Sequence, residues 1–310
     1  TVRALQYFKQ MCFYRIYATR ANKRLKFLLL EEKEKVKLFY CMKESAFLIK
    51  GKSFKNEALI SIVHPPMGNP PLRYIEMSIL SLKEGEEYEI STTGKECLFL
   101  LLRGKAKVVV HRQTFLAERE NLFKEKAYGI YIPPHTDFSV SAKKDSEFVF
   151  CFAPSEKKGK VVFIKPEDVK VRRVGEGNFY REVHDILAED IPADKLLVGE
   201  TFNPPGNWSS YPPHRHDEHN PPEKIRLEEV YHFRLHPENG FAMMRLYDDE
   251  LTINEALVVE NKDTVIISKG YHPVVSAPGY WLYYLWILAG EERKLIPIND
   301  PKHEWVIKRC

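Results

Sequence analysis

The chain has 310 residues, of which 44% are hydrophobic, and a formal net charge of +4. This length allows two domains of ordinary size, each with its own core. Its five cysteines are odd in number, scattered and without a CxxC pair, which argues against a disulfide framework and a thiolate zinc site. No stretch approaches the roughly 18 apolar residues of a membrane span, and no signal-peptide pattern appears. We therefore expect a soluble, cytoplasmic protein with no membrane partner.

The first 41 residues differ in charge and composition from the rest. They carry ten Lys and Arg against three Glu, which leaves the other 269 residues mildly acidic. A basic field confined to one terminal arm is weak support for nucleic-acid binding, so we expect no nucleic-acid partner. We interpret residues 1–41 as a basic extension outside the native protein, with the native reading frame starting at Met42. A basic amphipathic arm and an organellar presequence are the alternatives.

From Tyr74 onward the sequence consists of short runs rich in β-branched and aromatic residues, separated by Gly, Pro and charged turns. Runs of this length and spacing predict an all-β sandwich or barrel with few helices. The predicted strands of the first half are 74–82, 97–102, 105–110, 129–133, 138–142 and 147–153. Those of the second half are 195–202, 228–235, 240–247, 255–260, 263–268, 272–277 and 281–290.

The two halves repeat the same order of features. Glu96 precedes an apolar run and His135 follows 39 residues later, while Glu229 precedes "VYHF" and His272 follows 43 residues later. This similarity predicts an internal duplication of one β-barrel. We expect an N-terminal barrel at 42–160, a charged connector at 161–195 and a C-terminal barrel at 196–310.

Four residues of the second half could share a metal ion: His214, His216, Glu229 and His272. Residues i and i+2 of a strand face the same way, so an HxH pair can direct both imidazoles into a barrel. A carboxylate and a third imidazole from other strands complete a 3-His-1-carboxylate set that suits Zn, Mn, Fe or Ni. Taken one at a time, the HxH pair is equally compatible with a surface loop, Glu229 or Glu228 with a solvated carboxylate, and His272 with a rim histidine.

The order Gly206, HxH, Glu229, Gly270, His272 resembles the metal motifs of the cupin superfamily, although "SKGYH" lacks the usual Pro-x-Gly-x-x-His spacing. Longer stretches, among them "GNWSSYPPHRHD", "LEEVYHFRL", "KGYHPVVSAPGYWLYYL" and "GEGNFYREVHDI", resemble the 5-deoxy-glucuronate isomerases of myo-inositol catabolism. These are bicupins related to the 5-keto-4-deoxyuronate isomerases of pectin breakdown. The resemblance spans Met42 to the C-terminus and leaves the basic extension outside.

The resemblance implies a bicupin whose C-terminal barrel holds a divalent metal, most simply zinc, on His214, His216, Glu229 and His272. Glu229 is preferred to Glu228 because it directly precedes "VYHF". The implied reaction converts the aldose 5-deoxy-D-glucuronate to the ketose 2-deoxy-5-keto-D-gluconate. The N-terminal barrel has "ISTTG" where an HxH would lie, so its Glu96 and His135 form an incomplete site that we expect to be structural.

The sequence does not name the general base or the group that binds the substrate carboxylate. Tyr247, Arg245 and Lys269 are the predicted catalytic residues, the first two on the condition that their strand face points inward. Arg181 is a further candidate for the carboxylate. The simpler alternatives are that Tyr247 packs at the rim of the barrel and that Arg245 and Lys269 are solvated surface cations.

Other histidines and functions stay open at this point. His232 and His236 could compete for metal, and His219 belongs to an insert, 217–228, that is either a mobile lid or a solvated loop. A 5-keto-4-deoxyuronate isomerase, a cupin Fe(II) dioxygenase and a non-catalytic sugar-binding bicupin are the alternative functions. We expect a small sugar-acid substrate and a homo-oligomer.

Overall fold

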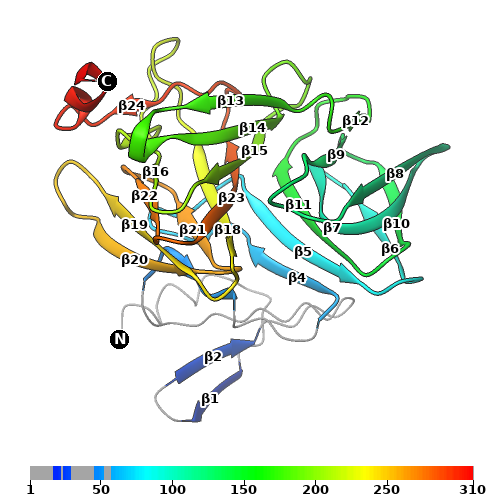
Figure 1. Cartoon of the computed structure of the whole chain (residues 1–310). Coiled ribbons are helices and arrows are strands. Elements are labelled where there is room, and N and C mark those ends of the chain that lie inside the picture. Colours follow the sequence, from blue (N-terminus) through cyan, green and yellow to red (C-terminus); the bar gives the residue numbers. More distant parts are fainter. Residues whose placement is uncertain (1–16, 22–23, 29–44, 52–56, 310) are drawn as a thin grey trace.

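The structure is a computed structural model that describes residues 17–21, 24–28, 45–51 and 57–309. Its regular structure is almost entirely β-strand, arranged as two barrels side by side (Figure 1). Two short 3-10 helices, η2 (Gly177–Phe179) and η3 (Glu304–Arg309), are present in these ranges. No described helix has the length and apolar character needed to cross a membrane. The prediction of an all-β bicupin is confirmed.

The predicted basic extension is described only at two short strands, β1 (Tyr17–Ala21) and β2 (Arg24–Leu28), which pair antiparallel. Figure 1 shows this hairpin below the two barrels. The remainder of the extension, and Met42, lie outside the described residues. The interpretation of residues 1–41 as an extension outside the native protein therefore stays a prediction.

The first barrel is built from nine strands in one hydrogen-bonded sheet that curls back on itself through its longest strand. The strands are β4 (Leu59–Val63), β5 (Glu76–Leu82), β6 (Glu87–Ser91), β7 (Lys95–Val110), β8 (Gln113–Arg119), β9 (Tyr128–Ile132), β10 (Asp137–Ala142), β11 (Ser146–Pro154) and β12 (Val162–Ile164).

Strand β7 joins two runs that the sequence suggests are separate. Its first part pairs with β9 and β11, and its second part, from Gly104 on, pairs with β8 and β10. Gly104 has a φ of 110°, and a Cβ there would collide with Ser146. Only glycine therefore fits at the bend where the strand passes from one wall of the barrel to the other.

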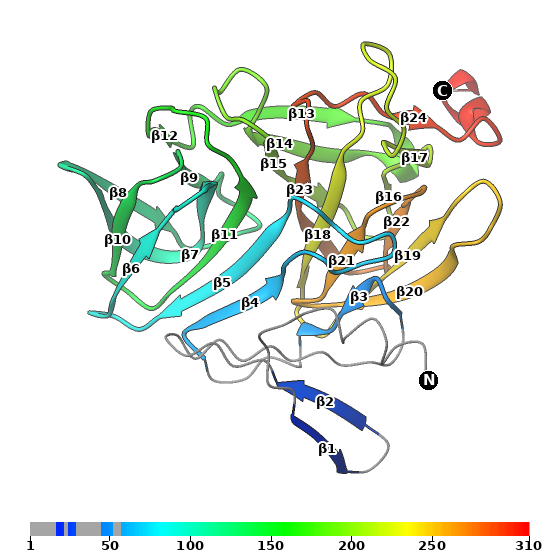
Figure 2. The ribbon, with the colours of Figure 1, turned by 180° about the vertical axis from the view of Figure 1, so that it is seen from behind.

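The second barrel combines a seven-stranded sheet with a four-stranded sheet and a two-stranded ladder (Figure 2). The seven-stranded sheet contains β3 (Leu48–Ile49), β13 (Lys170–Val174), β14 (Arg181–Leu187), β15 (Leu196–Asn203), β18 (Glu228–His236), β21 (Thr264–Ile267) and β23 (Trp281–Ala289). The four-stranded sheet contains β16 (Trp208–Ser209), β19 (Phe241–Tyr247), β20 (Asn254–Glu260) and β22 (Val274–Ser276), and the ladder contains β17 (His214–Arg215) and β24 (Ile298–Asn299).

The strands do not follow the predicted ranges of barrels and connector at every point. Within the predicted connector, 161–195, β12 pairs with β9 of the first barrel, and β13 and β14 extend the sheet of the second. In the opposite direction, β3 lies within the range predicted for the N-terminal barrel, 42–160, but pairs with β21 of the second barrel. Two barrel domains stay our proposal. In this division β12 belongs to the first barrel, and β3, β13 and β14 belong to the second.

Three apolar cores explain why several strands are hydrophobic on both faces. One core fills each barrel, and a third lies between them, where the outer sides of β5, β7, β11, β15 and β23 meet. In β23, Tyr283, Leu285 and Ile287 belong to this central core, while Tyr284 and Trp286 point into the second barrel. Because successive residues of a strand face opposite ways, both sets are buried.

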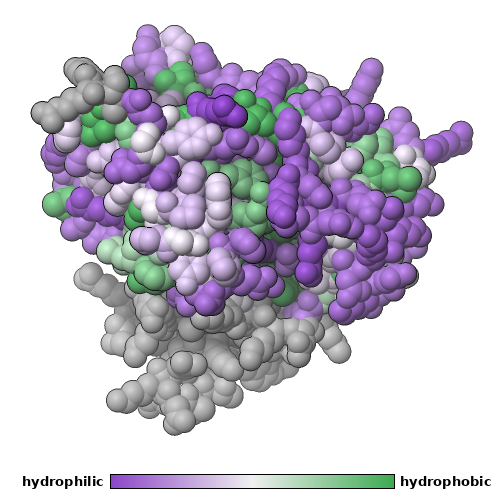
Figure 3. Space-filling model, in the orientation of Figure 1, coloured by the Kyte–Doolittle hydropathy of each residue, from purple (hydrophilic) through white to green (hydrophobic). Residues whose placement is uncertain are grey.

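The outer surface of the first barrel is mainly hydrophilic in the view of Figure 3.

Glu96 is one of the two residues of the incomplete site predicted for the first barrel. In the structure its side chain connects the two barrels. Its carboxylate is fully buried and accepts the backbone N–H groups of Asp194, Lys195 and Leu196 at 2.7, 2.7 and 2.8 Å. The hydroxyl of Tyr131 donates a fourth hydrogen bond at 3.0 Å. Residues 194–196 lead directly into β15, so the carboxylate, which comes from the first barrel, fixes the start of this strand of the second barrel.

Replacing Glu96 by glutamine is therefore expected to lower the free energy of unfolding by about 3 kcal/mol, because hydrogen bonds to a buried charged acceptor are lost. Urea denaturation measures this, and bound metal should not change. His135→Ala is the control, since His135 is exposed and pairs only with the exposed Glu156. Equal stabilities of Glu96→Gln and wild type would contradict the role assigned to Glu96.

Candidate metal centre and cavity

The centre of the second barrel is built on β18. Glu229 lies on the same face of this strand as Tyr231 and Phe233, which belong to the core of the second barrel. Glu228 faces the other way, where its carboxylate accepts the backbone N–H groups of Arg73 and Tyr74 at 2.6 and 2.9 Å. The alternation of the strand thus separates two adjacent carboxylates, and only Glu229 faces the barrel interior.

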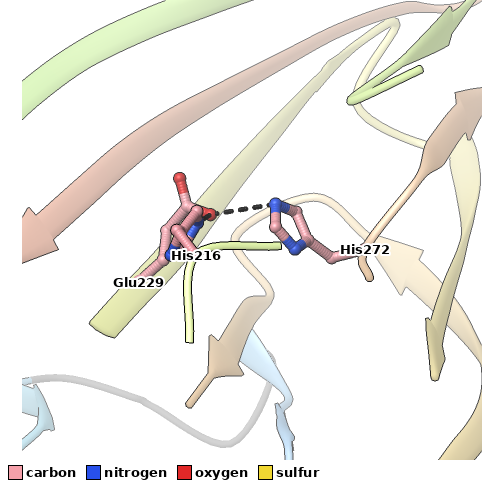
Figure 4. A group of neighbouring side chains, drawn as sticks. All are labelled: His216, Glu229 and His272. Atoms are coloured by element: carbon pink, nitrogen blue, oxygen red, sulfur yellow. Dashed lines mark hydrogen bonds and ion pairs between the residues drawn. The ribbon is translucent and has the colours of Figure 1, made fainter. Parts of the chain in front are cut away.

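Two histidines from distant segments converge on Glu229 (Figure 4). The Nε2 atoms of His216 and His272 lie 3.0 and 3.1 Å from the same carboxylate oxygen, Oε2. All three side chains are buried. Among the described residues they form the one cluster of three or more His, Cys, Asp and Glu side chains with ligand atoms close enough to share an ion.

Backbone contacts determine which nitrogen of each imidazole faces Glu229. Nδ1 of His216 lies 2.9 Å from the carbonyl of Leu227, and Nδ1 of His272 lies 3.0 Å from the carbonyl of Gly270. A carbonyl oxygen only accepts, so both Nδ1 atoms carry a proton, and in the neutral form of either ring the lone pair is at Nε2. Such carbonyl contacts are typical of histidines that bind metals through the other nitrogen.

This arrangement fits a divalent cation. Without a cation or an added proton, the Nε2 lone pairs would face the lone pairs of Oε2 at hydrogen-bond distance. Nε2 of His272 indeed has no hydrogen bond of good geometry, although it is buried. A positive ion between the three groups removes this repulsion, and imidazole with carboxylate is a donor set for Zn, Mn, Fe or Ni.

His214, the fourth predicted ligand, lies beside this cluster and not within it. Its ring centroid is 4.9 Å from that of His272 and 6.4 Å from that of His216. It lines the adjacent cavity together with Glu229. The structure thus brings three of the four predicted ligands together and places the fourth next to them.

The charges of these groups are interdependent. Burial acts to raise the pKa of Glu229, but the hydrogen bonds and charges of His216 and His272 outweigh it and lower the pKa to about 2. Burial and the neighbouring His272 and His216 lower the pKa of His214 to about 3. Burial acts to lower the pKa of His216, but the hydrogen bond and charge of Glu229 outweigh it and raise that pKa, so a metal ion would displace a proton from this imidazole.

A cavity of about 560 Å³ opens beside the cluster, between the barrel interior and the C-terminal segment. Arg181 on β14 lines it and is largely buried. Its Nη1 donates to the carbonyls of Phe179 and Tyr211 at 3.2 and 3.0 Å, and no carboxylate of the described residues lies within ion-pair distance. Burial lowers the pKa of this guanidinium, which remains cationic. A buried cation that lines a cavity and lacks a carboxylate partner is a ready site for an anionic ligand.

The strand that carries His214 is held from two sides. His214 and Arg215 of β17 pair with β24, and Asp300 donates its backbone N–H to the carbonyl of Pro213 at 2.8 Å. On the other side, the carboxylate of Asp217 accepts the backbone N–H of Gly270 at 2.9 Å. The C-terminal segment, which also lines the cavity, therefore positions the HxH motif.

The three predicted catalytic residues do not line this cavity. Arg245 faces the outside of the four-stranded sheet, where its guanidinium donates to Asn254 and lies over the ring of Tyr247. Tyr247 is buried, and its hydroxyl donates to Asp300 at 2.7 Å. Lys269 pairs with Asp248 at 3.0 Å. The prediction for Arg245 and Tyr247 requires that their strand face points inward, and the exposed Arg245 does not meet this condition. All three residues therefore lie outside the active site that we propose.

The other histidines lie apart from the cluster. His232 points away from the barrel interior and bonds to Thr264 Oγ1 at 2.8 Å. His236 is exposed and its ring packs near Phe123. His219 is exposed in the predicted insert, 3.8 Å from Glu292. In the first barrel, Glu96 and His135 belong to no such cluster of described residues.

The cavity wall also contains residues that the sequence analysis did not propose. Among them are five buried hydroxyl side chains: Thr201, Ser209, Ser210, Tyr231 and Tyr284. Tyr231 could have been found from its position two residues after Glu229, on the same strand face. Ser209 and Ser210 stand next to the HxH motif, but nothing in their spacing indicates that both reach the cavity.

Two barrels in one chain and a histidine–carboxylate cluster inside the second define a bicupin. Comparison of its fold agrees: oxalate decarboxylase from Lactobacillus farciminis in complex with formate superposes with a TM-score of 0.60 at 11% identity, covering 86% of this chain and 91% of that one. At this identity the likeness concerns the fold alone. The KduI/IolB family matches residues 47–306, and the chain belongs to this family.

Relatives within the family are considerably closer. The 5-deoxy-glucuronate isomerase of Geobacillus thermodenitrificans is 39% identical over 85% of this chain and 97% of its own length. The enzyme of that name from Bacillus subtilis strain 168 is 38% identical over 86% of this chain and 100% of its own length. The crystal structure of an IolB-like protein from Salmonella typhimurium has a TM-score of 0.79 and 34% identity, covering 84% of this chain and 99% of that one. The expectation of an isomerase is confirmed.

Proposed function

We propose that this isomerase converts 5-deoxy-D-glucuronate to 2-deoxy-5-keto-D-gluconate, in cytoplasmic myo-inositol catabolism, and that it requires a divalent metal, most simply zinc. One observation carries the proposal: a histidine–carboxylate cluster borders a cavity that also contains a buried, carboxylate-free arginine. The relatives named 5-deoxy-glucuronate isomerase supply the substrate. The sugar acid has an aldehyde at one end and a carboxylate at the other, and the cavity is lined both by the cluster, through Glu229, and by the cation Arg181.

The metal would be held by His216, Glu229 and His272, with His214 as the fourth ligand. When bound, a divalent cation supplies Lewis acidity, which stabilises negative charge on substrate oxygens as the carbonyl moves by one carbon. The chain itself contributes ionised Glu229 and, at His214, an imidazole whose low pKa keeps it neutral, whereas Glu229 raises the pKa of His216, so metal binding there would release a proton. The barrel core surrounding the cluster limits access of water.

Arg181 would bind the substrate carboxylate. Its Nη1 is committed to two carbonyls, which fixes the guanidinium plane and leaves the remaining N–H groups for a ligand. Because Glu229 lines the same cavity, an acid bound at Arg181 could bring its aldehyde to the cluster. Fixed placement of this kind is a large part of what an enzyme contributes to a reaction of one bound molecule.

The decisive assay incubates metal-loaded protein with 5-deoxy-D-glucuronate under nitrogen. Conversion without oxygen supports the isomerase, whereas a requirement for oxygen would point to a dioxygenase, and no turnover would contradict the proposed substrate. A parallel measurement of kcat/KM on 5-keto-4-deoxyuronate separates the sibling reaction. Metal analysis of protein purified from its own host identifies the metal. The homo-oligomer stays a prediction that light scattering tests.

Arg181→Met is expected to raise KM for the sugar acid by about 100-fold, since a charged hydrogen-bonding partner of the carboxylate is lost. Bound metal should be unchanged, because Arg181 is not among the proposed ligands. Arg172→Met is the matched control: this arginine also lines the cavity, but Asp185 already holds it through two hydrogen bonds. An unchanged KM in Arg181→Met would show that the carboxylate binds elsewhere.

A further inference from the structure

Five buried hydroxyl side chains line the same cavity as Arg181 and Glu229, and we call them the hydroxyl wall. They come from four different segments: Thr201 from β15, Ser209 and Ser210 from the end of β16, Tyr231 from β18 and Tyr284 from β23. All five are buried. Buried hydroxyls are costly unless each finds a partner, so such a concentration requires an explanation.

The hydroxyls form two tyrosine–serine pairs that lie against each other. Ser209 Oγ is 2.5 Å from the Tyr284 hydroxyl, and Ser210 Oγ is 2.9 Å from the Tyr231 hydroxyl. The two tyrosine rings have centroids 4.4 Å apart. The hydroxyl of Tyr284 also interacts with those of Thr201 and Ser210, which connects both pairs into one group.

The backbone is bent in a way that produces this group. Ser209 and Ser210 are adjacent, and in an extended strand their side chains would point to opposite sides. Ser210 instead has a φ of 50°, in the left-handed region that serine seldom adopts. This turn directs both serine hydroxyls toward tyrosines of the barrel interior. Strained conformations of this kind persist where the surrounding structure holds them, commonly at ligand sites.

The group retains hydrogen-bonding capacity for a ligand. Each hydroxyl has one O–H donor and two acceptor lone pairs. The four contacts among the five hydroxyls use most of their O–H donors, but most lone pairs of the group remain open to a ligand that donates. A ligand hydroxyl can both donate and accept, so it fits this wall better than a carbonyl, which only accepts, or an apolar group, which does neither.

We propose that this hydroxyl wall is a specificity subsite that recognises the hydroxyl groups of the bound acid on the carbons between its carboxylate and its reacting end. The inference rests on the proposed function for the identity of the substrate, because 5-deoxy-glucuronate has hydroxyl-bearing carbons that do not react. Arg181 binds the charged end, and the wall distinguishes a polyhydroxylated acid from a plain one. Sites built to bond a ligand hydroxyl discriminate strongly against analogues that lack it.

The test uses two acids that cannot be isomerised: D-gluconate, which has hydroxyls along its chain, and hexanoate, which has none. Calorimetry on the metal-loaded protein should show much tighter binding of gluconate than of hexanoate. Tyr284→Phe and Ser209→Ala should each weaken gluconate binding by about tenfold, since each removes a hydroxyl and disturbs its partner. Hexanoate binding should change less than twofold. The double variant should lose less than the product of the two single losses, because the pair acts as a unit.

Tyr128→Phe is the matched control, because it removes a tyrosine hydroxyl from the first barrel, away from the cavity. Circular dichroism and metal content of each variant verify that the barrel and its cluster are intact. Equal affinity of the wild type for gluconate and hexanoate overturns the subsite, as does a parallel loss of both ligands in Tyr284→Phe. A wild type that prefers gluconate but does not isomerise 5-deoxy-D-glucuronate leaves the subsite standing and refutes the proposed function.

Discussion

Glu229→Gln is expected to lose bound divalent metal and to lower turnover of the sugar acid by at least about 10³-fold. Glutamine keeps the size of the side chain but removes the charge on which the Nε2 atoms of His216 and His272 converge at 3.0 and 3.1 Å. The effect is large because no other carboxylate of the described residues lies in the cluster. Plasma mass spectrometry of the dialysed protein measures the metal, and the isomerisation assay measures the rate.

Glu228→Gln provides the control for this experiment. The residue is adjacent in sequence, buried, and also a carboxylate, but its oxygens bond to the backbone of Arg73 and Tyr74 between the barrels. We expect the Glu228 variant to keep its metal and to lose stability, while the Glu229 variant keeps the β fold. Full metal content and full rate in Glu229→Gln would refute the assignment of the ligands.

The core of this site could be predicted because it depends on short-range rules. Glu229 is preferred to Glu228 because it directly precedes "VYHF", and the alternation of β18 explains why only one of the two faces the interior. A fully apolar strand such as β23 indicates burial on both faces. Residue type and spacing already indicate the four ligands, and the resemblance of the sequence to known isomerases implies the same set. Three of these four residues share a cluster in the structure, and the fourth is adjacent.

The orientation of β19 could not be read in the same way. Its sequence "FAMMRLY" places apolar residues on both faces, so the pattern does not determine which face is buried. In the fold, Ala242, Met244 and Leu246 are buried, and Phe241, Met243 and Arg245 face outward. Arg245 is therefore outside the cavity, and the assignment of Arg245 to catalysis depended on information that the strand does not contain.

Long-range pairing accounts for the remaining differences. β13 has the sequence "KVRRV" and is largely exposed at an edge of its sheet, so its charges resemble those of a connector. The pairing of β17 with β24 joins segments more than 80 residues apart and brings the C-terminus to the cavity. The left-handed Ser210, which shapes the hydroxyl wall, has no signature in its neighbours. None of these features follows from local periodicity.

The second large effect concerns the joint between the barrels. Arg119→Met is expected to lower the free energy of unfolding by about 3–5 kcal/mol, because it leaves the charge of Glu200 buried and unpaired. Arg119 of β8 holds this carboxylate through two hydrogen bonds, of 2.6 and 3.0 Å, and both side chains are completely buried. The hydroxyl of Tyr283 donates to the same carboxylate at 2.9 Å and cannot replace the lost charge. Urea denaturation followed by far-UV circular dichroism measures the loss.

A double-mutant cycle distinguishes the ion pair from general loss of packing. If the pair is responsible, Arg119→Met combined with Glu200→Gln should be less destabilised than the sum of the single variants, because neither charge is left without its partner. Lys105→Met is the control from the neighbouring part of the first barrel, where Lys105 forms a half-exposed ion pair with Glu118 that should contribute little. Additive losses in the cycle would show that Arg119 stabilises the joint through its contacts with the carbonyls of Leu122 and Glu125 and not through Glu200. Glu200 directly precedes Thr201 of the hydroxyl wall in β15. A measured coupling between Arg119 and Glu200 would therefore mean that the first barrel helps to position the cavity wall, although the first barrel contributes no residue to the site.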